Sequence, residues 1–374
     1  MSPVEDFVGL DELAQLVDEV LEQGMHIVEC GPSNSHSGAF KEAWAQLERY
    51  AGLIQRYDRG KTLPHADIRK RQTGEAKRCP GLLILGERGC GKGFFARKLA
   101  TLIPGDRGTL VTVNCSAVST GLFQAEMFGH VKGSFTGAHE NRAGKFDAAH
   151  EKILFLDEVG ELSLDEQRAL NDAIQSGRTQ GVGGRTQNVD LVVVAATLRD
   201  LDDEVAAGRF NSDFRDRFAF KIHIPSLAER RRDIPRLLQN SFADFGPFVG
   251  WQGFSLKLNM HEEALHRFVN YSWPGNVREL ENTVWELLSR WETVPNERID
   301  VSDLPESLRR AAVVETQRSF SEEEIVSLLR SKSLNLVSEE TGLPVSELKE
   351  IRARNGIRFK PGGPGLKRAR RSSA

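Results

Sequence analysis

The sequence is short of cysteine, of net charge and of long apolar runs, and each shortage excludes a class of protein. The four cysteines stand in no CxxC or Cys/His metal spacing: Cys30, Cys79, Cys90 and Cys115. The most apolar runs, "GLLILG", "ILFLD" and "LVVVAAT", are far below the roughly 20 residues that a membrane-spanning helix needs. With no signal-peptide pattern at the N-terminus, these shortages predict a reduced, cytoplasmic chain with no membrane partner.

The charge balance argues against general binding to nucleic acid. The net charge is -3 over 374 residues, of which 39% are hydrophobic and 28% charged, a composition typical of a soluble protein of two or three domains. Only the last segment, "FKPGGPGLKRARRSSA", is strongly basic, with five basic residues and no acidic one. Any contact with nucleic acid is therefore expected to be local.

Short apolar runs rich in branched residues alternate with helical patterns along the middle of the chain. Runs of this kind, without polar alternation, are typical of a parallel sheet covered by helices on both faces. Helical spacing occurs between them in "GFFARKLATLI" and in "DEQRALNDAIQSG", which stops at a glycine. Strands are predicted near 81–85, 110–114, 153–156, 191–196 and 220–224.

Composition also divides the chain into segments. The first 74 residues contain helical patterns at 11–22 and 39–57, followed by a charged, proline-containing stretch; they are too few for a receiver domain, so control by phosphorylation in cis is not expected. The predicted segments are an N-terminal helical segment and insertion over 1–74, an α/β core over 75–227, a helical domain over 228–292, a linker over 293–319, a helical cluster over 320–357 and a basic disordered tail over 358–374.

A phosphate-binding loop is predicted at "GERGCGKG", which follows an apolar strand and opens a helix. Backbone N–H groups and the helix N-terminus can cradle phosphates, and Lys92 can reach the β- and γ-oxygens. Position 93 is glycine where Ser or Thr is usual, so Mg²⁺ must be held mainly by another group and by water. The alternative is a plain glycine-rich turn. The expected nucleotide ligands are Gly86, Glu87, Arg88, Gly89, Cys90, Gly91, Lys92 and Gly93.

A pair of acids ends the strand in "ILFLDEVGEL". Adjacent carboxylates at the end of a central strand suit a division of labour, in which Asp157 orients Mg²⁺ through its waters and Glu158 polarises the attacking water. Alone, such a pair is usually a solvated strand end. The lysine loop upstream favours the catalytic interpretation, with Asp157, Glu158 and Lys92 as catalytic residues.

These motifs belong to a longer pattern. The succession "GERGCGKG", "NCSAV", "EMFGHVKGSFTGAHENRAGKFDAAH", "ILFLDEVGELS", "QGVGGRT", "VVVAATLRDL" and "WPGNVRELEN" resembles the AAA+ domain of bacterial enhancer-binding proteins over roughly residues 81 to 292. The resemblance implies an AAA+ P-loop ATPase core with a parallel sheet, a helical lid and a C-terminal helix-turn-helix. It also implies ATP and Mg²⁺ as cofactors, sigma-54 RNA polymerase and upstream (enhancer) DNA as partners, and self-association into a ring, with a hexamer expected.

The same resemblance gives a role to "GSFTGA". In that family the motif reads GAFTGA and forms the tip of a loop that grips sigma-54; glycines permit large changes in φ and ψ, and an exposed aromatic ring supplies contact area. Read without the family, the segment is a surface turn with a buried phenylalanine. The expected sigma-54 contacts are Gly133, Ser134, Phe135, Thr136, Gly137 and Ala138.

Three polar residues take family positions around the nucleotide. Asn114 matches the asparagine that holds the catalytic glutamate, although a strand-end asparagine can simply cap its neighbour. Thr197 matches the sensor I position, but Leu198 follows it where the family has a polar residue. Arg278 resembles sensor II, the alternative being a surface arginine paired with Glu281.

The segment "GRFNSDFRDRFAF" departs most from the family. Two arginines usually act there as fingers in the neighbouring subunit's site; the first position is Asn211 here, the second is Arg217, and Arg215 is an additional arginine. A finger contributes about 10³–10⁵ in rate. We therefore expect slower hydrolysis than in a standard member, or rescue by Arg215.

A C-terminal DNA reader is predicted in "EEIVSLLRSKSLNLVSEETGLPVSELKEIRARNGI", which has the helix, glycine turn and serine-capped helix of a helix-turn-helix. The alternative is a small helical bundle for oligomer contacts. The basic tail would add phosphate attraction or serve as a solubilising end. The expected DNA contacts are Ser346, Glu347, Lys349, Arg352 and Arg354.

Two functions follow from these residues. The first is a sigma-54-dependent transcriptional activator, a ring-forming ATPase that remodels the closed promoter complex. The alternative is a nucleotide-binding regulator with impaired hydrolysis, acting as scaffold, partner subunit or antagonist; Gly93, Leu198 and Asn211 favour it. Without a receiver domain, expression level or another protein in trans is expected to set the activity.

Overall fold

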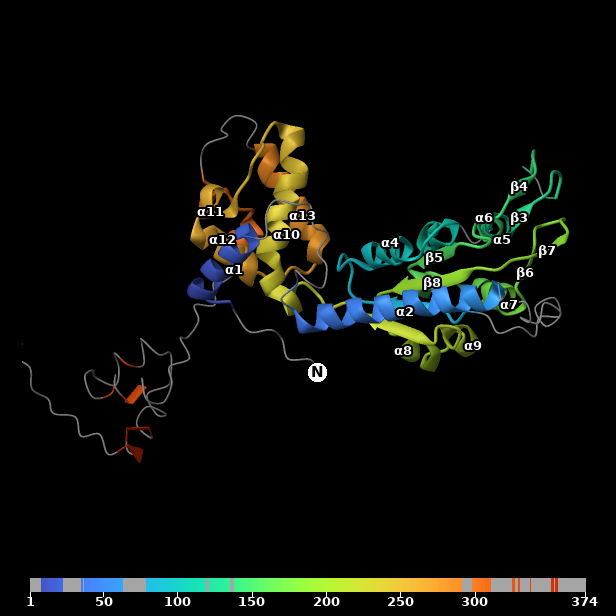
Figure 1. Cartoon of the computed structure of the whole chain (residues 1–374), viewed down its shortest axis with the longest axis horizontal. Helices are drawn as coiled ribbons and strands as arrows, with labels where there is room; N and C mark the ends of the chain where they lie inside the picture. Colours follow the sequence, from blue (N-terminus) through green and yellow to red (C-terminus); the bar gives the residue numbers. More distant parts are fainter. Residues whose placement is uncertain are drawn as a thin grey trace, which may run out of the picture. The chain divides into compact units, whose positions relative to one another are not determined.

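The computed structural model describes most of the chain. The described residues are 8–22, 35, 37–62, 79–118, 121–134, 138–290 and 298–310, together with 325, 326, 329, 337, 351, 352, 354 and 355. The chain divides into two compact units, Met1–Leu308 and Arg309–Ala374. The first unit holds an α/β subdomain and a helical subdomain, the lid (Figure 1).

A parallel sheet forms the centre of the α/β subdomain. Among the described residues it has five strands in the order β2-β5-β8-β1-β9. All five predicted strands are confirmed to within one residue at each end. The three central strands, β1, β5 and β8, are apolar runs buried on both faces. The strands are β1 (Leu82–Leu85), β2 (Leu110–Asn114), β5 (Ile153–Asp157), β8 (Val192–Thr197) and β9 (Phe220–His223).

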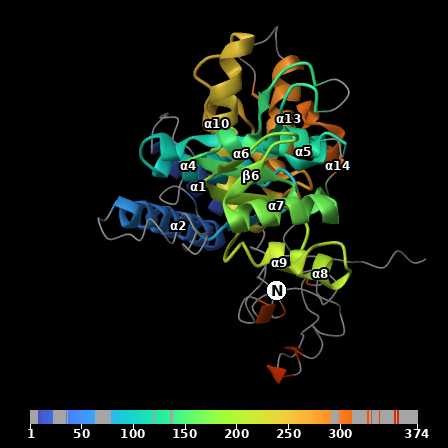
Figure 2. The ribbon, with the colours of Figure 1, turned by 90° about the vertical axis from the view of Figure 1, so that its right-hand side faces the viewer.

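Each face of the sheet has its own apolar core. Alternate residues such as Leu82 and Val194 pack against α2 (Gly38–Thr62) and α4 (Lys92–Leu102). Their neighbours, such as Leu83 and Val193, pack on the opposite face. Figure 2 shows α2 and α4 on one side and α5 and α7 on the other. The helices of that second face are α5 (Phe123–Phe128), α6 (Lys145–Ala148), α7 (Leu164–Ser176), α8 (Leu201–Ala206) and α9 (Ser212–Arg215).

Helix α7 illustrates how local sequence fixes an element. Ser163 and Glu166 form a capping box at its start, and Gly177 ends it in the left-handed conformation with φ 60°. The predicted stop at this glycine is confirmed.

Two short hairpins extend from the α/β subdomain and lie beside each other (Figure 1). Strands β3 (Gly129–His130) and β4 (Arg142–Ala143) flank the "GSFTGA" segment, while β6 (Arg178–Gln180) and β7 (Thr186–Asn188) form the second hairpin. A bridge between His130 and Val182 joins the two. The base of one hairpin is therefore fixed to the turn of the other.

The lid is a helical subdomain with its own core, which includes Phe242, Phe268 and Trp273. Its helices are α10 (Ile234–Phe245), α11 (Leu256–Asn259), α12 (Glu262–Asn270), α13 (Asn276–Arg290) and α14 (Glu306–Arg310), the last of which runs past the boundary of the first unit. Short 3₁₀ segments complete the first unit at Asp106–Gly108, Cys115–Ala117, Val159–Glu161, Ala228–Asp233, Gly246–Val249 and Val301–Asp303.

The two helices expected near the N-terminus are present, but they belong to two different cores rather than to a segment of their own. Helix α1 (Leu10–Glu22) buries Leu13, Leu16 and Val17 in the core of the lid, whereas α2 packs on the sheet. The side-chain amide of Asn270 accepts from the Val8 N–H at 3.2 Å and donates to the Val8 carbonyl at 3.1 Å. Helical periodicity predicted the helices, and only the fold assigns their partners.

None of the helices in the described ranges combines the length and the apolar character that crossing a membrane requires. In the second unit, Arg352 and Arg354 lie beside a turn in which the Asn355 N–H donates to the Ile351 carbonyl at 3.1 Å. The other expected DNA contacts, Ser346, Glu347 and Lys349, lie outside the described residues, so the helix-turn-helix stays a prediction.

Candidate functional site

The polar residues predicted from sequence follow the carboxyl ends of neighbouring strands. Because parallel strands end at the same edge of a sheet, the loop after β1 and the acids at the end of β5 meet there. The register places Asn114 opposite Asp157 and Leu85 opposite Thr197. This edge is therefore a single site assembled from four strands.

Lys92, the first residue of α4, lies at the centre of the site. It is only 6% exposed, and its Nζ donates to the carbonyls of Gly86 at 3.0 Å and Glu87 at 3.1 Å. Its Nζ also lies 3.7 Å from Oε1 of Glu158. A nearly buried ammonium requires such partners, because an unpaired charge is costly away from water. The lysine is thus held between the loop and the catalytic candidate.

The acid pair has an uncommon backbone. Glu158 adopts the left-handed conformation with φ 53° and ψ 49°, which costs a non-glycine residue about 1–3 kcal/mol and is frequent at functional sites. The Glu158 N–H donates to Oδ1 of Asp157 at 3.1 Å.

The donor set fits a magnesium ion that is shared with a phosphate. No group of three or more His, Cys, Asp or Glu able to hold a metal occurs among the residues the structure describes. Mg²⁺ is commonly held by one or two carboxylates, phosphate oxygens and water rather than by a full protein cage, and Asp157 supplies one such carboxylate. Burial raises the pKa of the nearby Cys115 thiol to about 12, with Asp157 adding to the shift.

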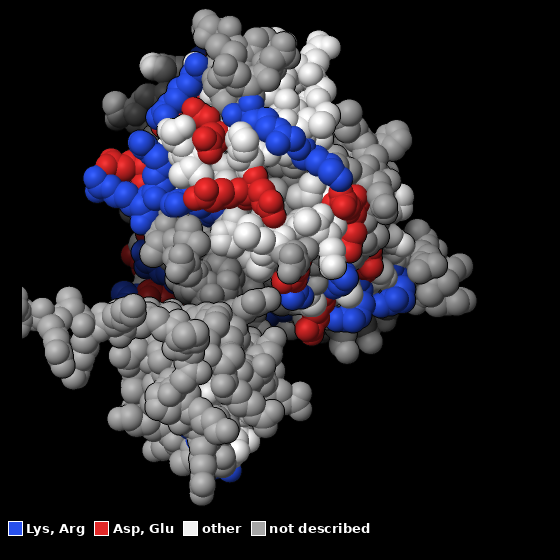
Figure 3. Space-filling model, turned by 90° about the vertical axis from the view of Figure 1, so that its left-hand side faces the viewer, with Lys and Arg blue, Asp and Glu red and all other residues white. Residues whose placement is uncertain are grey.

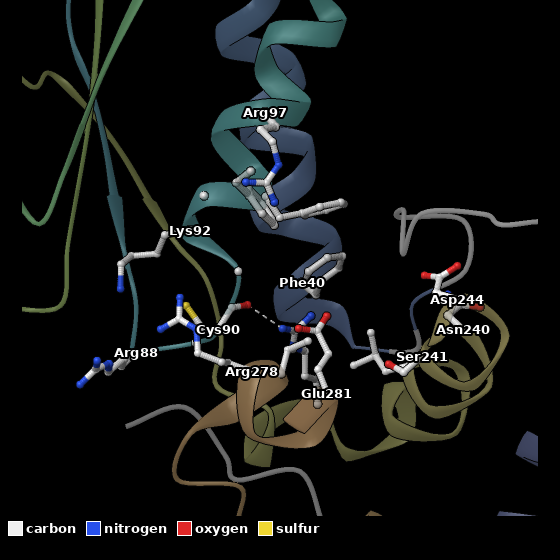
Figure 4. A pocket seen from close by; sticks show the side chains of 18 of the residues that line it. Phe40, Arg88, Cys90, Lys92, Arg97, Asn240, Ser241, Asp244, Arg278 and Glu281 are labelled. Carbon is white, nitrogen blue, oxygen red and sulfur yellow. Dashed lines mark hydrogen bonds between the residues drawn. The ribbon is translucent and has the colours of Figure 1, made fainter. Parts of the chain in front are cut away.

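A cavity of about 820 Å³ lies between the phosphate-binding loop and the lid. Figure 4 shows Lys92, Cys90 and Arg88 on the side of the loop and Asn240, Ser241 and Asp244 of α10 on the other. Its size falls in the range of small-molecule sites. Val20 of α1 and Phe40 of α2 also line it, so both N-terminal helices contribute to the cavity, a role that sequence patterns did not indicate.

Asn114 and Thr197, the residues expected to act near the nucleotide from the strand ends, differ in whether they line this cavity. Asn114 lines it, but its Oδ1 accepts hydrogen bonds from the N–H and Oγ of Ser116, at 3.1 and 2.8 Å. This is the capping interaction foreseen as the alternative for Asn114. Thr197 is fully buried, and its Oγ1 accepts from the Arg199 N–H at 3.1 Å. The residue of this strand end that lines the cavity is Leu198, which is 52% exposed.

Arg278 and Glu281 line the cavity from α13 (Figure 4). Partial burial raises the pKa of Glu281, while the charge of Arg278 opposes that shift. The charges of the two side chains interact, but among the described residues Arg278 and Glu281 form no salt bridge. Arg278 is exposed, and its guanidinium is available to a bound anion.

Arg217, the second finger position, lies at the amino-terminal end of the strands, opposite the phosphate-binding loop. The Gly81 N–H, just before β1, donates to the Arg217 carbonyl at 2.9 Å, and Arg217 Nε donates to Oδ1 of Asn171 at 2.9 Å. Strand β1 has four residues, or about 13 Å at 3.3 Å per residue, and it separates Arg217 from the phosphate-binding loop of its own chain.

Asn211, at the first finger position, and the additional Arg215 are both engaged in local contacts. The side chain of Asn211 is the N-cap of α9, accepting from the Phe214 N–H at 2.9 Å. Arg215 pairs with Asp202 at 3.0 Å and Asp216 at 2.7 Å. Both contacts hold these side chains within their own subunit.

Only part of the "GSFTGA" segment is described. The Gly133 N–H donates to the Ala138 carbonyl at 2.8 Å, and Gly133 has φ 80°, a value that favours glycine. The buried hydroxyl of Ser134 has no hydrogen-bond partner among the described residues. Phe135, Thr136 and Gly137 lie outside them. The loop is therefore closed at its base by a backbone hydrogen bond around these three residues.

Surface charge gives no extended footprint for nucleic acid on the face seen in Figure 3, where basic and acidic side chains interleave. Ion pairs also join the lid to α1: Lys257 pairs with Asp18 at 2.8 Å, and Arg232 pairs with Glu12 at 2.7 Å. Paired charges of this kind attract phosphate weakly.

Comparison with known proteins identifies the class. Residues 36–223 match the sigma-54 interaction domain, and residues 228–320 match the AAA+ ATPase lid domain. The chain belongs to the family of sigma-54-dependent, AAA+ enhancer-binding regulators.

Individual relatives place it more closely within that family. It is 41% identical over 244 residues to the regulatory protein LuxO of Vibrio cholerae, covering 63% of this chain and 45% of LuxO. It is 36% identical over 270 residues to the DNA-binding transcriptional regulator NtrC of Escherichia coli, covering 69% of this chain and 56% of NtrC. The chain thus spans about half the length of these relatives.

A solved structure shares the fold. NtrX from Brucella abortus in complex with ATP superposes with a TM-score of 0.59 at 23% identity, covering 92% of this chain and 73% of NtrX. The likeness supports the α/β AAA+ architecture with its helical lid.

Proposed function

We propose that this protein is a sigma-54-dependent transcriptional activator that couples ATP hydrolysis to remodelling of the closed promoter complex. One observation carries the proposal: in a chain with a sigma-54 interaction domain, Lys92, Asp157 and Glu158 meet at one edge of the sheet. These are the groups that a phosphoryl-transfer site needs to bind phosphate, hold a metal ion and orient water.

Each residue has a distinct role in this site. Lys92 exchanges its carbonyl partners for phosphate oxygens, and the backbone N–H groups of Gly89 to Gly93 bind the remaining phosphate charge. Asp157 would hold Mg²⁺, which would supply positive charge against the phosphate groups during transfer. Glu158 then orients the attacking water. The lid closes the site over the nucleotide and brings Arg278 to it.

Hydrolysis takes place between subunits of a ring. Arg217 lies at the sheet edge opposite its own phosphate-binding loop, so its guanidinium can serve only the site of a neighbouring copy. A ring of identical subunits, expected to be a hexamer, satisfies this geometry at every interface. Phe135 and Thr136 then contact sigma-54 from the loop that β3 and β4 support.

Upstream DNA is bound by the C-terminal segment through its predicted helix-turn-helix, with Arg352 and Arg354 among the contacts. A regulatory protein or a related subunit acting in trans sets the activity.

A second candidate is a regulator with impaired hydrolysis that acts as scaffold, partner subunit or antagonist. It is supported by Gly93, by Leu198 in the cavity and by the engagement of Asn211 and Arg215 in local contacts. Arg215 must break two ion pairs before it can rescue the missing finger.

The test is capture of purified sigma-54 by the full chain in ADP and aluminium fluoride, which mimics the γ-phosphoryl group during transfer. Capture that requires the nucleotide and is lost in Thr136→Ala supports the activator. Absence of capture by a protein that binds nucleotide and forms rings favours the second candidate.

A further inference from the structure

Asn276, the first residue of α13, joins three segments through one buried amide. Its Nδ2 donates to Oε2 of Glu87 at 2.9 Å and to the Arg88 carbonyl at 3.1 Å. Its Oδ1 accepts from the Leu227 N–H at 2.6 Å. Both donor hydrogens and the acceptor are used, and the side chain is fully buried. One lid residue therefore contacts the phosphate-binding loop and the connection between the two subdomains.

The turn that precedes α13 is built to present this amide. Asn276 has φ 54° and Trp273 has φ 46°, two left-handed residues in the sequence "SWPGNV". Such conformations cost about 1–3 kcal/mol each unless surrounding contacts impose them. Here the Gly275 N–H donates to Oε2 of Glu279 at 2.7 Å, and the Trp273 indole donates to the Phe268 carbonyl at 2.8 Å. The strain is held by specific bonds at the point of contact with the loop.

The backbones of lid and loop approach each other closely at the same place. A Cβ atom on Gly89 would lie 2.2 Å from the Gly275 carbonyl oxygen and 3.2 Å from Cβ of Arg278. Gly89 also has φ 77°, so a side chain is disfavoured there twice. This contact and the Asn276 amide fix the start of α13 against the loop, two residues before Arg278.

Carbonyl groups of the phosphate-binding loop accept hydrogen bonds from side chains. Lys92 binds those of Gly86 and Glu87, Asn276 binds that of Arg88, and Arg230 of the lid donates to that of Cys90 at 2.8 Å. Carbonyl oxygens repel phosphate, so an anion-binding loop needs them directed away from the ligand. The lid supplies two of the donors that do this.

We propose that Asn276 is a positioning residue for the nucleotide site and that the Glu87 carboxylate is its hydrogen-bond acceptor on the loop. It keeps Arg278 beside the cavity and holds the Arg88 carbonyl away from bound phosphate. The orientation of the lid and the affinity of the loop for phosphate are therefore linked through one amide. This inference rests on the proposed ATP site and names the residue that couples its two halves.

The experiment exchanges the direction of the hydrogen bond. Asn276→Asp keeps the acceptor for Leu227 but removes both donors and opposes the Glu87 carboxylate with a second one. Glu87→Gln provides a new donor for that carboxylate. The single variants, the double variant and the wild-type chain are compared for ADP affinity by calorimetry, and for KM and kcat of ATP hydrolysis well below each melting temperature. Asn259→Asp is the matched control, because Asn259 uses only its oxygen, which accepts from the Ser255 N–H at 2.9 Å in the lid.

We expect Asn276→Asp to weaken ADP binding and to lower kcat/KM by about tenfold or more, as befits loss of buried hydrogen bonds. Glu87→Gln should lower kcat/KM by about threefold or less, since its amide oxygen still accepts, more weakly than the carboxylate. The double variant should recover at least threefold over Asn276→Asp, a coupling that a double-mutant cycle measures. Asn259→Asp should match the wild type.

Two outcomes overturn the proposal: wild-type kinetics in Asn276→Asp, or a double variant as impaired as that single variant. If Asn276→Asp fails to fold, Glu87→Ala decides, because Glu87 is exposed and its loss should still raise KM severalfold; an unchanged KM contradicts the proposal. Failure of the wild-type chain to bind ADP would instead count against the ATP site itself.

Discussion

The nucleotide site and the finger segment, residues 208–220, differ in how far they keep the residues of the family. At the carboxyl edge, Lys92, Asp157 and Glu158 keep the family's residues, and Lys92 is nearly buried with three partners. In the finger segment, Asn211 is a helix cap and Arg215 pairs with acids of its own chain. Groups that act within a subunit are fixed by the core that positions them. Asn211 and Arg215 are only partly buried, and at such positions a substitution can gain a local contact and leave the fold intact.

The largest expected effect tests the surviving finger. Arg217→Ala should lower ATP hydrolysis by about 10³–10⁵, the range for loss of a trans-acting arginine, with nucleotide binding retained. Phosphate release by the assembled protein measures it. Arg168→Ala, which removes an exposed arginine paired with Asp165 on α7, is the control. A rate within threefold of the wild type would show that Arg217 contributes no finger.

Glu158→Gln tests the nucleotide site itself. It removes the group that orients water, so hydrolysis should fall by about 10²–10⁴, while ADP affinity stays near that of the wild type. Loss of ADP binding together with hydrolysis would mean that Glu158 supports the loop through Lys92 instead.

Mixing these two variants tests whether Glu158 and Arg217 of one active site come from different subunits. A Glu158→Gln subunit can lend its Arg217 to an Arg217→Ala neighbour whose Glu158 is intact. An equimolar mixture should therefore hydrolyse ATP well above either variant alone. If mixed rings form and stay inactive, each site must depend on residues of one chain.

Asn211→Arg restores the missing finger and should raise the hydrolysis rate severalfold. It also removes the cap of α9, at a cost of about 1 kcal/mol in the free energy of unfolding, which thermal melting detects. Asn211→Asp keeps the capping oxygen without an arginine and should leave both quantities near the wild type. No gain in rate would sink the idea that position 211 limits catalysis.

The smallest effect concerns Glu281 in the cavity. Its pKa is raised by burial, so its contribution to stability is present below the pKa of the unfolded chain and is lost as pH rises through the folded value. Glu281→Gln should therefore raise the melting temperature slightly at pH 7 and leave it unchanged in acid, where the carboxyl is protonated in both states. Equal shifts at both pH values would exclude this charge as the cause.

Sequence reasoning reached the parts of the molecule that depend on local pattern. The central strands follow from unbroken apolar runs, and the glycine-rich turn between β1 and α4 follows from glycine spacing between a strand and a helix. The site residues on the strand ends were accessible because parallel strands share an edge.

Contacts between distant segments were not accessible in this way. Asn276 meets Glu87 across 189 positions, and Arg230 meets Cys90 across 140. Nothing in the local spacing of either residue indicates the other. The capping role of Asn211 was not predicted either. Comparison with the family drew attention to the arginine missing at this position rather than to the hydrogen-bond acceptor that the first turn of α9 needs.

Helix α1 has a consequence for synthesis of the chain. Its apolar residues Leu13, Leu16 and Val17 are buried only against lid residues that begin at Leu227, about 210 positions later. At about 5–20 residues per second, this face waits roughly 10–40 seconds for its partner while the α/β subdomain emerges and folds. The lid is therefore the last part of the first unit to be completed on the ribosome. Until then the apolar face of α1 lacks the lid residues that bury it in the folded protein.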